Sequence, residues 1–372
     1  MIYSGNRIKE LDGLRGIAII MVFLYHCLPR SLFISNNAYT YFIYRLSNMG
    51  WSGVDLFFVL SGFLITSILL RSKDKPNYFV NFYARRILRI FPLYYFSLIL
   101  IFTTLPFINA KDFLVISNFQ IWYYLYIQNW ITALSLINIP SYFGHYWSLA
   151  IEEQFYVIWP AIIYNLKNKY ILIVCGIITT MSLFYRLYSF LSTKDENIGN
   201  YLAFSSITRI DGLMIGAFVA VMLYDGRLND KLVGYAKILS ALSVILISLF
   251  ILNNTASIIW NNPPMLIFGF TVLGVLAGCL VIISILSPYT SFLRLLLRGS
   301  VLSFFGKYSY AMYIFHFPII LAYVFLFGIM KAHGIVFWCF FLVSCAATTI
   351  LASLISWHAL EKHAIGLKRY FA

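Results

Sequence analysis

Long apolar runs separated by short basic loops dominate this sequence and leave few folds open to it. Of its 372 residues, 61% are hydrophobic and only 11% are charged, whereas a soluble domain carries about a quarter charged residues. A soluble fold cannot bury that much apolar surface, so we expect lipid to cover it. The sequence therefore predicts an all-α fold, a polytopic membrane helical bundle.

The apolar runs have the length of transmembrane helices, which need about 20 residues to cross a bilayer. We expect about ten such helices, over residues 12–30, 51–70, 87–107, 147–166, 170–190, 204–224, 235–252, 265–286, 304–327 and 335–357. Residues 108–146 are also apolar in part. We interpret them as a re-entrant or interfacial segment on the outer side, because one extra crossing would invert every later helix.

The basic residues give the orientation, because cytoplasmic loops carry an excess of Lys and Arg. With both termini cytoplasmic, most of the 27 Lys and Arg fall inside. The outer side keeps only Arg30, Arg45, Lys111, Arg186, Lys194, Arg209 and Lys331. We interpret the net charge of +14 as an adaptation to anionic lipid, not to nucleic acid. We expect one inner-membrane domain over residues 1–372, with no appended soluble domain.

Two polar residues share one face of the first predicted span. Arg15 and His26 are eleven positions apart, about three helical turns, with a rise of roughly 16 Å. Arg15 is then near the inner surface, and His26 is near mid-membrane. A neutral imidazole can accept a proton at physiological pH, so His26 is our candidate for the catalytic base. The alternative is a hydrogen-bonded packing histidine.

Arg85, Arg86 and Arg89 stand at the cytoplasmic mouth of the span 87–107. Arg86 and Arg89 are three positions apart and therefore lie on one face of a helix. Two neighbouring guanidinium groups suit a phosphate-rich ligand. The alternative is ordinary anchoring by basic residues at the inner surface.

Acidic groups at membrane depth supply the other candidates, because charged groups there are costly and often functional. We expect Glu152 or Asp55 to orient the His26 imidazole and to stabilise its protonated form; the alternative is a hydrogen bond between helices. Arg209 and Asp211 could pair with each other, which favours a structural role for both. The proposed substrate cavity comprises His316, Glu153, Trp147, Arg209 and Asp211. We expect no metal site.

Six strings carry a family resemblance. They are LDGLRGIA from Leu11, GVDLFFVLSGFLI from Gly53, FYARRILRIFP from Phe82, WSLAIEEQFY from Trp147, RIDGLMIG from Arg209 and YSYAMYIFH from Tyr308. Together, and in this order, they resemble the acyltransferase 3 family of membrane acyltransferases. Each string alone is moderately specific, but six in order over nearly the whole chain are strongly specific.

The resemblance implies an enzyme that uses cytoplasmic acyl-CoA, expected to be acetyl-CoA, to O-acylate a carbohydrate made for the cell surface, such as a lipopolysaccharide O-antigen or an exopolysaccharide unit. Arg86 and Arg89 match the family's Arg-x-x-Arg donor motif, and Arg15 and His26 match its first-helix pair. Glu152 matches the carboxylate after Trp-Ser-Leu. Some members carry an extracytoplasmic hydrolase-like domain, and we expect no transfer step through such a domain here.

These observations lead to one hypothesis. Arg86 and Arg89, with Arg85 and Arg15, hold the CoA phosphates, and the thioester arm reaches inward to His26, where a hydroxyl of a sugar or lipid-linked sugar meets it. The chief alternative is a membrane transporter of an anionic or glycolipid substrate that performs no acyl transfer. A third is a binding or sensing protein in which His26 and His316 are structural.

Overall fold

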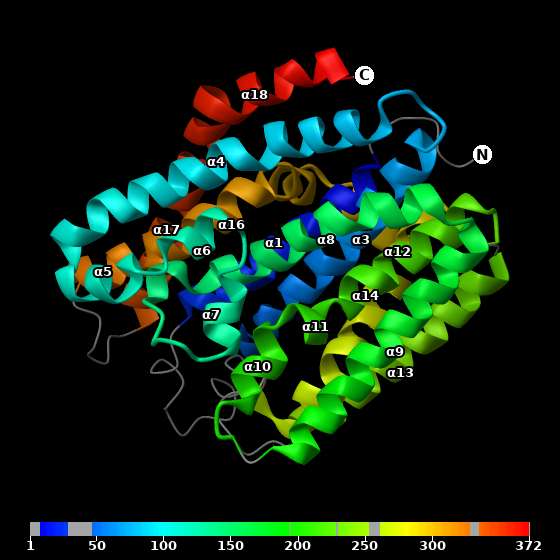
Figure 1. The fold of residues 1–372 in the computed structure, drawn as a ribbon, viewed down its shortest axis with the longest axis horizontal. Helices are drawn as coiled ribbons and strands as arrows, with labels where there is room; N and C mark the ends of the chain where they lie inside the picture. The colour runs from blue at the N-terminus through cyan, green and yellow to red at the C-terminus, as the bar shows by residue number, and fades with distance from the viewer. Residues whose placement is uncertain are drawn as a thin grey trace.

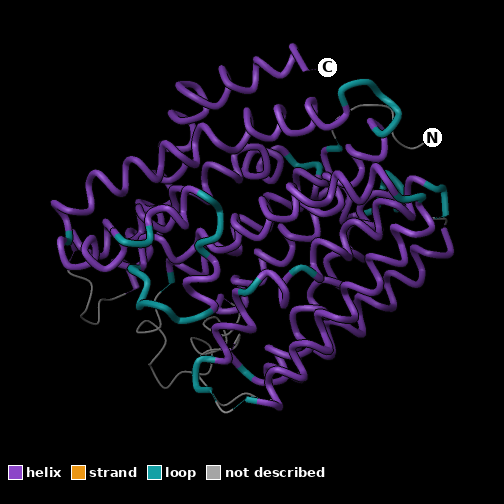
Figure 2. Tube along the Cα trace, in the orientation of Figure 1, coloured by secondary structure: helices purple, strands orange, loops and turns teal. Residues whose placement is uncertain are grey.

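Helices make up nearly all of the regular structure. The computed structural model describes residues 8–28, 47–193, 195–227, 230–252, 261–327 and 335–371, and these ranges contain helices and connecting loops but no strand (Figure 2). Many of the long helices run in one general direction across the molecule (Figure 1). The all-α fold predicted from the sequence is confirmed for the described ranges.

The long helices coincide with the predicted spans. They are α1 (Lys9–Cys27), α3 (Gly53–Ser72), α4 (Tyr78–Ile108), α8 (Trp147–Asn165), α9 (Asn168–Ser192), α12 (Asp211–Tyr224), α13 (Asp230–Leu252), α14 (Phe270–Leu286), α16 (Ser300–Phe327) and α17 (Ile335–Ser356). In the described part of the chain, seven helical stretches are long and apolar enough to cross a membrane. They include neither α1 nor α8, and α12 has only 14 residues. The chain is thus a multi-pass membrane protein, while the count of about ten and the cytoplasmic termini stay predictions.

Some details of the predicted layout cannot be compared with the structure. The end of the span 12–30 lies outside the described residues, as do Arg30, Arg45, Lys194 and Lys331 of the predicted outer side.

The segment 108–146 contains no long helix. It folds into short pieces: α5 (Ala110–Ser117), α6 (Gln120–Tyr124), α7 (Asn129–Ala133) and η3 (Ser141–Tyr146). The segment therefore does not cross the membrane as one helix, in line with the re-entrant or interfacial interpretation. The other short elements are η2 (Met49–Ser52), α10 (Ile198–Phe204), α11 (Ser206–Arg209), η5 (Met265–Gly269), α15 (Phe292–Leu297), η6 (Trp357–Glu361), α18 (Lys362–Gly366) and η7 (Leu367–Phe371).

Glycines allow the central helices to approach closely. A Cβ added to Gly306 of α16 would lie 1.8 Å from the backbone oxygen of Asp12 on α1. One added to Gly62 of α3 would lie 2.0 Å from the backbone oxygen of Leu213 on α12. Small residues bring helix backbones together in membranes, where packing replaces the hydrophobic effect between helices. These glycines fix α1 against α16 and α3 against α12.

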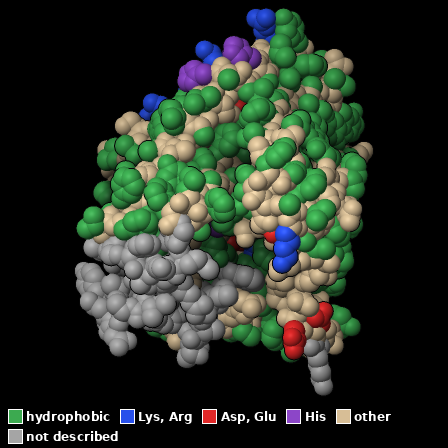
Figure 3. Space-filling view, turned by 90° about the vertical axis from the view of Figure 1, so that its left-hand side faces the viewer, with side chains coloured by type: hydrophobic (Ala, Val, Ile, Leu, Met, Phe, Trp, Pro, Cys, Tyr) green, Lys and Arg blue, Asp and Glu red, His purple; other side chains and the backbone are tan. Residues whose placement is uncertain are grey.

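Apolar side chains cover much of the outer surface. Val157 and Met181 are each 63% exposed and Leu242 is 51% exposed, which fits a surface in contact with lipid. Figure 3 shows one face that is largely hydrophobic, with Lys, Arg and His side chains along its upper edge. The C-terminal elements α18 and η7 pack along α4 (Figure 1), and they bring Lys368 to the cavity described below.

Candidate active site

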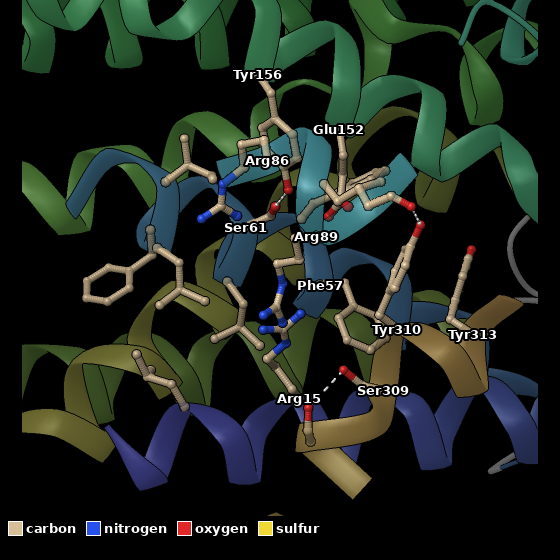
Figure 4. Close-up of a pocket in the computed structure, with 18 of the residues that line it drawn as sticks. Arg15, Phe57, Ser61, Arg86, Arg89, Glu152, Tyr156, Ser309, Tyr310 and Tyr313 are labelled. Carbon is tan, nitrogen blue, oxygen red and sulfur yellow. Dashed lines mark hydrogen bonds between the residues drawn. The ribbon is translucent and has the colours of Figure 1, made fainter. Parts of the chain in front are cut away.

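A basic cavity of about 640 Å³ lies among α1, α3, α4, α8, α16 and the C-terminal elements. We call it the inner cavity. Its basic lining residues come from five elements that are far apart in the sequence: Arg15, Arg71, Arg86, Arg89, Lys307 and Lys368. Figure 4 shows Arg15, Arg86 and Arg89 extending into one common space. The structure thus brings the two predicted donor arginines together with Arg15.

Three arginines of the inner cavity, Arg15, Arg86 and Arg89, are not neutralised by direct ion pairs in the described part of the chain. Within the described residues, no carboxylate lies within the 4.0 Å ion-pair distance of Arg15, Arg86 or Arg89. The Nε atom of Arg86 is buried without a hydrogen-bond partner there. Arg85, predicted as a fourth donor residue, does not line the cavity, although its Nε is also buried without a partner in the described part. Because half-buried cations without an ion pair favour a counter-charge, this cavity suits an anionic ligand.

Two carboxylates and two hydroxyl groups face these arginines. Glu152 lies beside Ser61 and Tyr156 and interacts electrostatically with Arg15. Glu153, the next residue, also lines the inner cavity. The side-chain oxygens of Ser61 and Tyr156 form a short hydrogen bond (Figure 4). Glu152 is therefore a residue of the inner cavity.

A second cavity, of about 670 Å³, lies at the other end of α1. We call it the outer cavity. Its aromatic, imidazole and guanidinium groups come from Tyr25, His26, Trp51, His145, Trp147, Phe204, Arg209, Phe270 and Phe317, and its small polar groups come from Thr132, Ser135, Asn138, Ser141, Asn197 and Asn200. Val54 and Tyr313 line both cavities. The two cavities thus approach each other at Val54 and Tyr313, and His26 lines the outer one.

Three histidines pack together beside the outer cavity. The Nδ1 atom of His26 lies 2.9 Å from the Val22 carbonyl oxygen and 3.2 Å from Nε2 of His316. The Nε2 atom of His145 lies 3.2 Å from the Ile314 carbonyl oxygen. The ring centroid of His316 is 5.0 Å from that of His26 and 5.4 Å from that of His145. His316 does not line either cavity but lies directly behind His26.

The ion pairs differ from the expected ones. Asp55 binds Arg209 at 2.8 Å, and Asp211 binds Arg186 of α9 at 2.8 Å. The predicted Arg209–Asp211 pair is wrong because residues two positions apart do not face each other on a helix. The predicted carboxylate partner of His26 is also wrong, because Asp55 is committed to Arg209 and Glu152 lies in the inner cavity.

The predicted substrate residues divide between the two cavities. Glu153 lines the inner cavity, and Trp147 and Arg209 line the outer one. Asp211 lines neither cavity. Sequence reasoning missed the cavity residues Ser61, Arg71, Tyr156, Lys307, Lys368 and Tyr313. Ser61 and Tyr156 could have been found, because they lie in the motif strings that begin at Gly53 and Trp147.

Among the described residues, no group of three or more His, Cys, Asp or Glu side chains is arranged so that it could hold a metal ion. The fold and the two cavities define a multi-pass membrane protein with an arginine-lined cavity at one end of α1 and a histidine-lined cavity at the other. Residues 8–357 match the family model described as an acyltransferase domain. The chain belongs to this family.

Curated relatives agree with this assignment. The chain is 28% identical over 331 residues to the peptidoglycan O-acetyltransferase OatA of Listeria monocytogenes, covering 86% of this chain and 50% of the relative. It is also 28% identical over 331 residues to the O-acetyltransferase OatA of Staphylococcus aureus, covering 86% of this chain and 51% of the relative. The chain spans about half the length of the curated relatives it matches. No solved structure matches it.

Proposed function

We propose that this chain is an inner-membrane O-acyltransferase that moves an acetyl group from cytoplasmic acetyl-CoA to a hydroxyl of a surface carbohydrate. The observation that carries the proposal is the meeting of two different cavities at Val54 and Tyr313. The inner cavity is lined by Arg15, Arg86 and Arg89, none of which forms an ion pair with another described residue, and the outer cavity is lined by His26. An acyl donor in the inner cavity and an acceptor in the outer cavity can therefore meet at Val54 and Tyr313.

The inner cavity is the proposed donor site. Its volume of about 640 Å³ falls within the range of about 300–1,000 Å³ that is usual for ligand pockets. Arg15, Arg86 and Arg89 bind the CoA phosphates through charge-assisted hydrogen bonds, with Arg85 supporting them from the second turn of α4. The pantetheine arm extends toward Val54 and Tyr313. The inner cavity is then cytoplasmic, as are both termini.

The outer cavity is the proposed acceptor site. Aromatic rings such as Trp147 and Phe317 offer flat apolar surfaces to a sugar ring, while Asn197, Asn200 and Ser135 offer hydrogen-bonding groups. Such a mixture of apolar walls and a few polar groups suits a polar ligand that needs orientation. A relative is named as a peptidoglycan O-acetyltransferase, and we accordingly propose a carbohydrate or lipid-linked sugar as the acceptor.

His26 is the proposed general base. It takes the proton from the acceptor hydroxyl while the oxygen attacks the thioester carbonyl. The carbonyl carbon then forms the new C–O bond, the C–S bond breaks, and the CoA sulfur leaves with the electron pair of that bond. The proton on His26 returns to this thiolate or to solvent, so the products are an ester and CoA thiol.

The test uses purified protein in lipid nanodiscs with radiolabelled acetyl-CoA and a lipid-linked sugar acceptor. We expect His26→Ala to abolish transfer but keep donor binding, and Arg86→Ala to weaken donor binding. His358→Ala and Arg227→Ala change residues outside both cavities and serve as matched controls. If His26→Ala transfers at the wild-type rate, His26 is not the base. Substrate movement into proteoliposomes without release of CoA would instead support a transporter.

A further inference from the structure

We propose that His316 is a positioning residue that acts together with the Val22 carbonyl oxygen to hold His26 in the tautomer with the proton on Nδ1, so that Nε2 of His26 is the unprotonated nitrogen. The consequence for catalysis rests on the proposed function, in which His26 is the base. The tautomer itself rests only on the contacts of the two imidazole rings.

The contacts of His316 determine its own tautomer. Its Nδ1 atom lies 2.8 Å from the carbonyl oxygen of Tyr313 and 3.2 Å from that of Met312. Carbonyl oxygens only accept hydrogen bonds, so Nδ1 of His316 carries the hydrogen. The ring is 0% exposed, and a buried imidazolium without a charged partner is costly. His316 is therefore neutral, and its Nε2 atom is an acceptor.

The contacts of His26 follow from this assignment. Its Nδ1 atom lies near two acceptors, the Val22 carbonyl oxygen at 2.9 Å and the His316 Nε2 atom at 3.2 Å. Only an N–H group at Nδ1 satisfies both acceptors. The lone pair of the neutral ring is thus on Nε2. His26, unlike His316, lines the outer cavity, so the nitrogen that is able to accept a proton belongs to the ring that substrates reach.

His145 completes the set of titratable groups around this pair. Its Nε2 atom donates to the Ile314 carbonyl oxygen, and its buried Nδ1 atom has no partner in the described part of the chain. The other rings packed on His26 are Tyr25 and Phe317. When His26 takes a proton, both acceptors of its Nδ1–H stay in place and stabilise the imidazolium, a role that carboxylates play in many other catalytic sets.

The close packing of α1 against α16 fixes the position of His26 relative to His316. Gly306 lies against Asp12 so closely that a single added methyl group would clash. The same two helices carry His26 and His316, and the hydrogen bonds of both rings to carbonyls of their own helices, at Val22, Met312 and Tyr313, limit ring rotation. The geometry of the pair is therefore set before any substrate binds.

The experiment compares His316→Leu with His316→Gln in purified protein. Leu cannot accept a hydrogen bond, whereas the Gln amide oxygen can accept one from His26 Nδ1. We expect Leu to lower kcat by about 100-fold, the lower end of the range for general base catalysis, with the KM for acetyl-CoA unchanged. Gln should recover kcat to within about tenfold of the wild type. The ¹⁵N resonances of the His26 ring, assigned with His26→Gln, should show the Nδ1–H tautomer in the wild type and in His316→Gln but a mixture in His316→Leu.

His358→Leu is the matched control. The Nδ1 atom of His358 also lies 2.8 Å from a carbonyl oxygen one helical turn back, that of Leu354. Unlike His316, His358 is exposed, and it lies outside both cavities. Unchanged ¹⁵N resonances of His26 in His316→Leu would overturn the proposal, as would equal loss of kcat in the Leu and Gln variants that bind CoA normally. If His26→Ala keeps full transfer while the resonances behave as expected, the proposed base is wrong and the tautomer assignment stands.

Discussion

The hydroxyl of Tyr313 donates a hydrogen bond to the carbonyl oxygen of His145 at 3.0 Å. Ser148 lies 2.6 Å from the same hydroxyl, so the phenol ring is held firmly in the wall between the two cavities. Val54 of α3 is the other residue that lines both cavities. We therefore expect the size of these two side chains to control the connection between the proposed donor site and the proposed acceptor site.

Enlarging Val54 should block that connection. We expect Val54→Trp to slow transfer by about 100-fold, because a displacement of about 1 Å between reacting groups has an effect of that size. The affinity for acetyl-CoA, measured by isothermal titration, should stay near the wild-type value, since the phosphate-binding arginines are untouched. Val54→Ala should transfer at close to the wild-type rate. Equal activity of the Trp and Ala variants would show that the reaction takes place elsewhere.

Lys368 should strengthen donor binding. It lines the inner cavity with Arg86 and Arg89 but lies beyond residues 8–357 that match the family model. Loss of one charge-assisted hydrogen bond to phosphate should weaken CoA binding by about tenfold, and Lys368→Glu should weaken it more than Lys368→Ala. Arg369→Ala, which removes an adjacent exposed cation outside the cavity, should bind CoA normally. Similar affinities for all three variants would contradict the prediction.

The Asp55–Arg209 pair should matter chiefly for stability. The two side chains are 5% and 2% exposed, and breaking a buried ion pair on one side typically costs about 3–5 kcal/mol. We expect Asp55→Ala to lower the unfolding midpoint strongly and the double variant Asp55→Leu/Arg209→Met to recover much of the loss. Thermal unfolding in detergent measures both effects.

The control for this pair is the more exposed pair of Asp225 and Arg227, at 3.1 Å. Asp225→Ala should change the stability by no more than about 1 kcal/mol. A single variant Asp55→Ala as stable as Asp225→Ala would mean that Asp55 is not a structural partner of Arg209, and the carboxylate would return as a candidate for a role in catalysis.

Gly306→Ala should push α1 away from α16, because the new Cβ would lie 1.8 Å from the Asp12 oxygen. We expect a lower thermal midpoint and a loss of transfer, since His26 and His316 sit on these two helices. Gly176→Ala, where no atom lies within 4 Å of the new Cβ, should leave both properties unchanged. Normal transfer by Gly306→Ala would show that the site tolerates separation of the two helices.

The positions of polar groups along each helix could be predicted from the sequence. The eleven-residue spacing of Arg15 and His26 places them at opposite ends of α1, and the structure has them in the inner and outer cavities, respectively. The three-residue spacing of Arg86 and Arg89 likewise predicts one face, and both line the inner cavity. The face of a helix on which a residue lies depends only on the spacing of residues within that helix. It does not depend on which helices are its neighbours.

The partners between helices could not be predicted in the same way. His26 and His316 are 290 positions apart, and Asp55 and Arg209 are 154 positions apart. Hydropathy shows which residues enter the membrane but not which helices are neighbours there. The docking of Lys368 on α4 is a tertiary contact of the same kind, so a residue expected only on the cytoplasmic side turned out to line a cavity.

The wall made by Val54 and Tyr313 also bears on the electrical integrity of the membrane. A continuous column of water through a protein of this kind would let ions and protons run down their gradients. Here the residues that line both cavities are an apolar side chain, Val54, and an aromatic one, Tyr313, which form a barrier to such a column. A cell can therefore carry many copies of this protein without short-circuiting the voltage that drives its other transport.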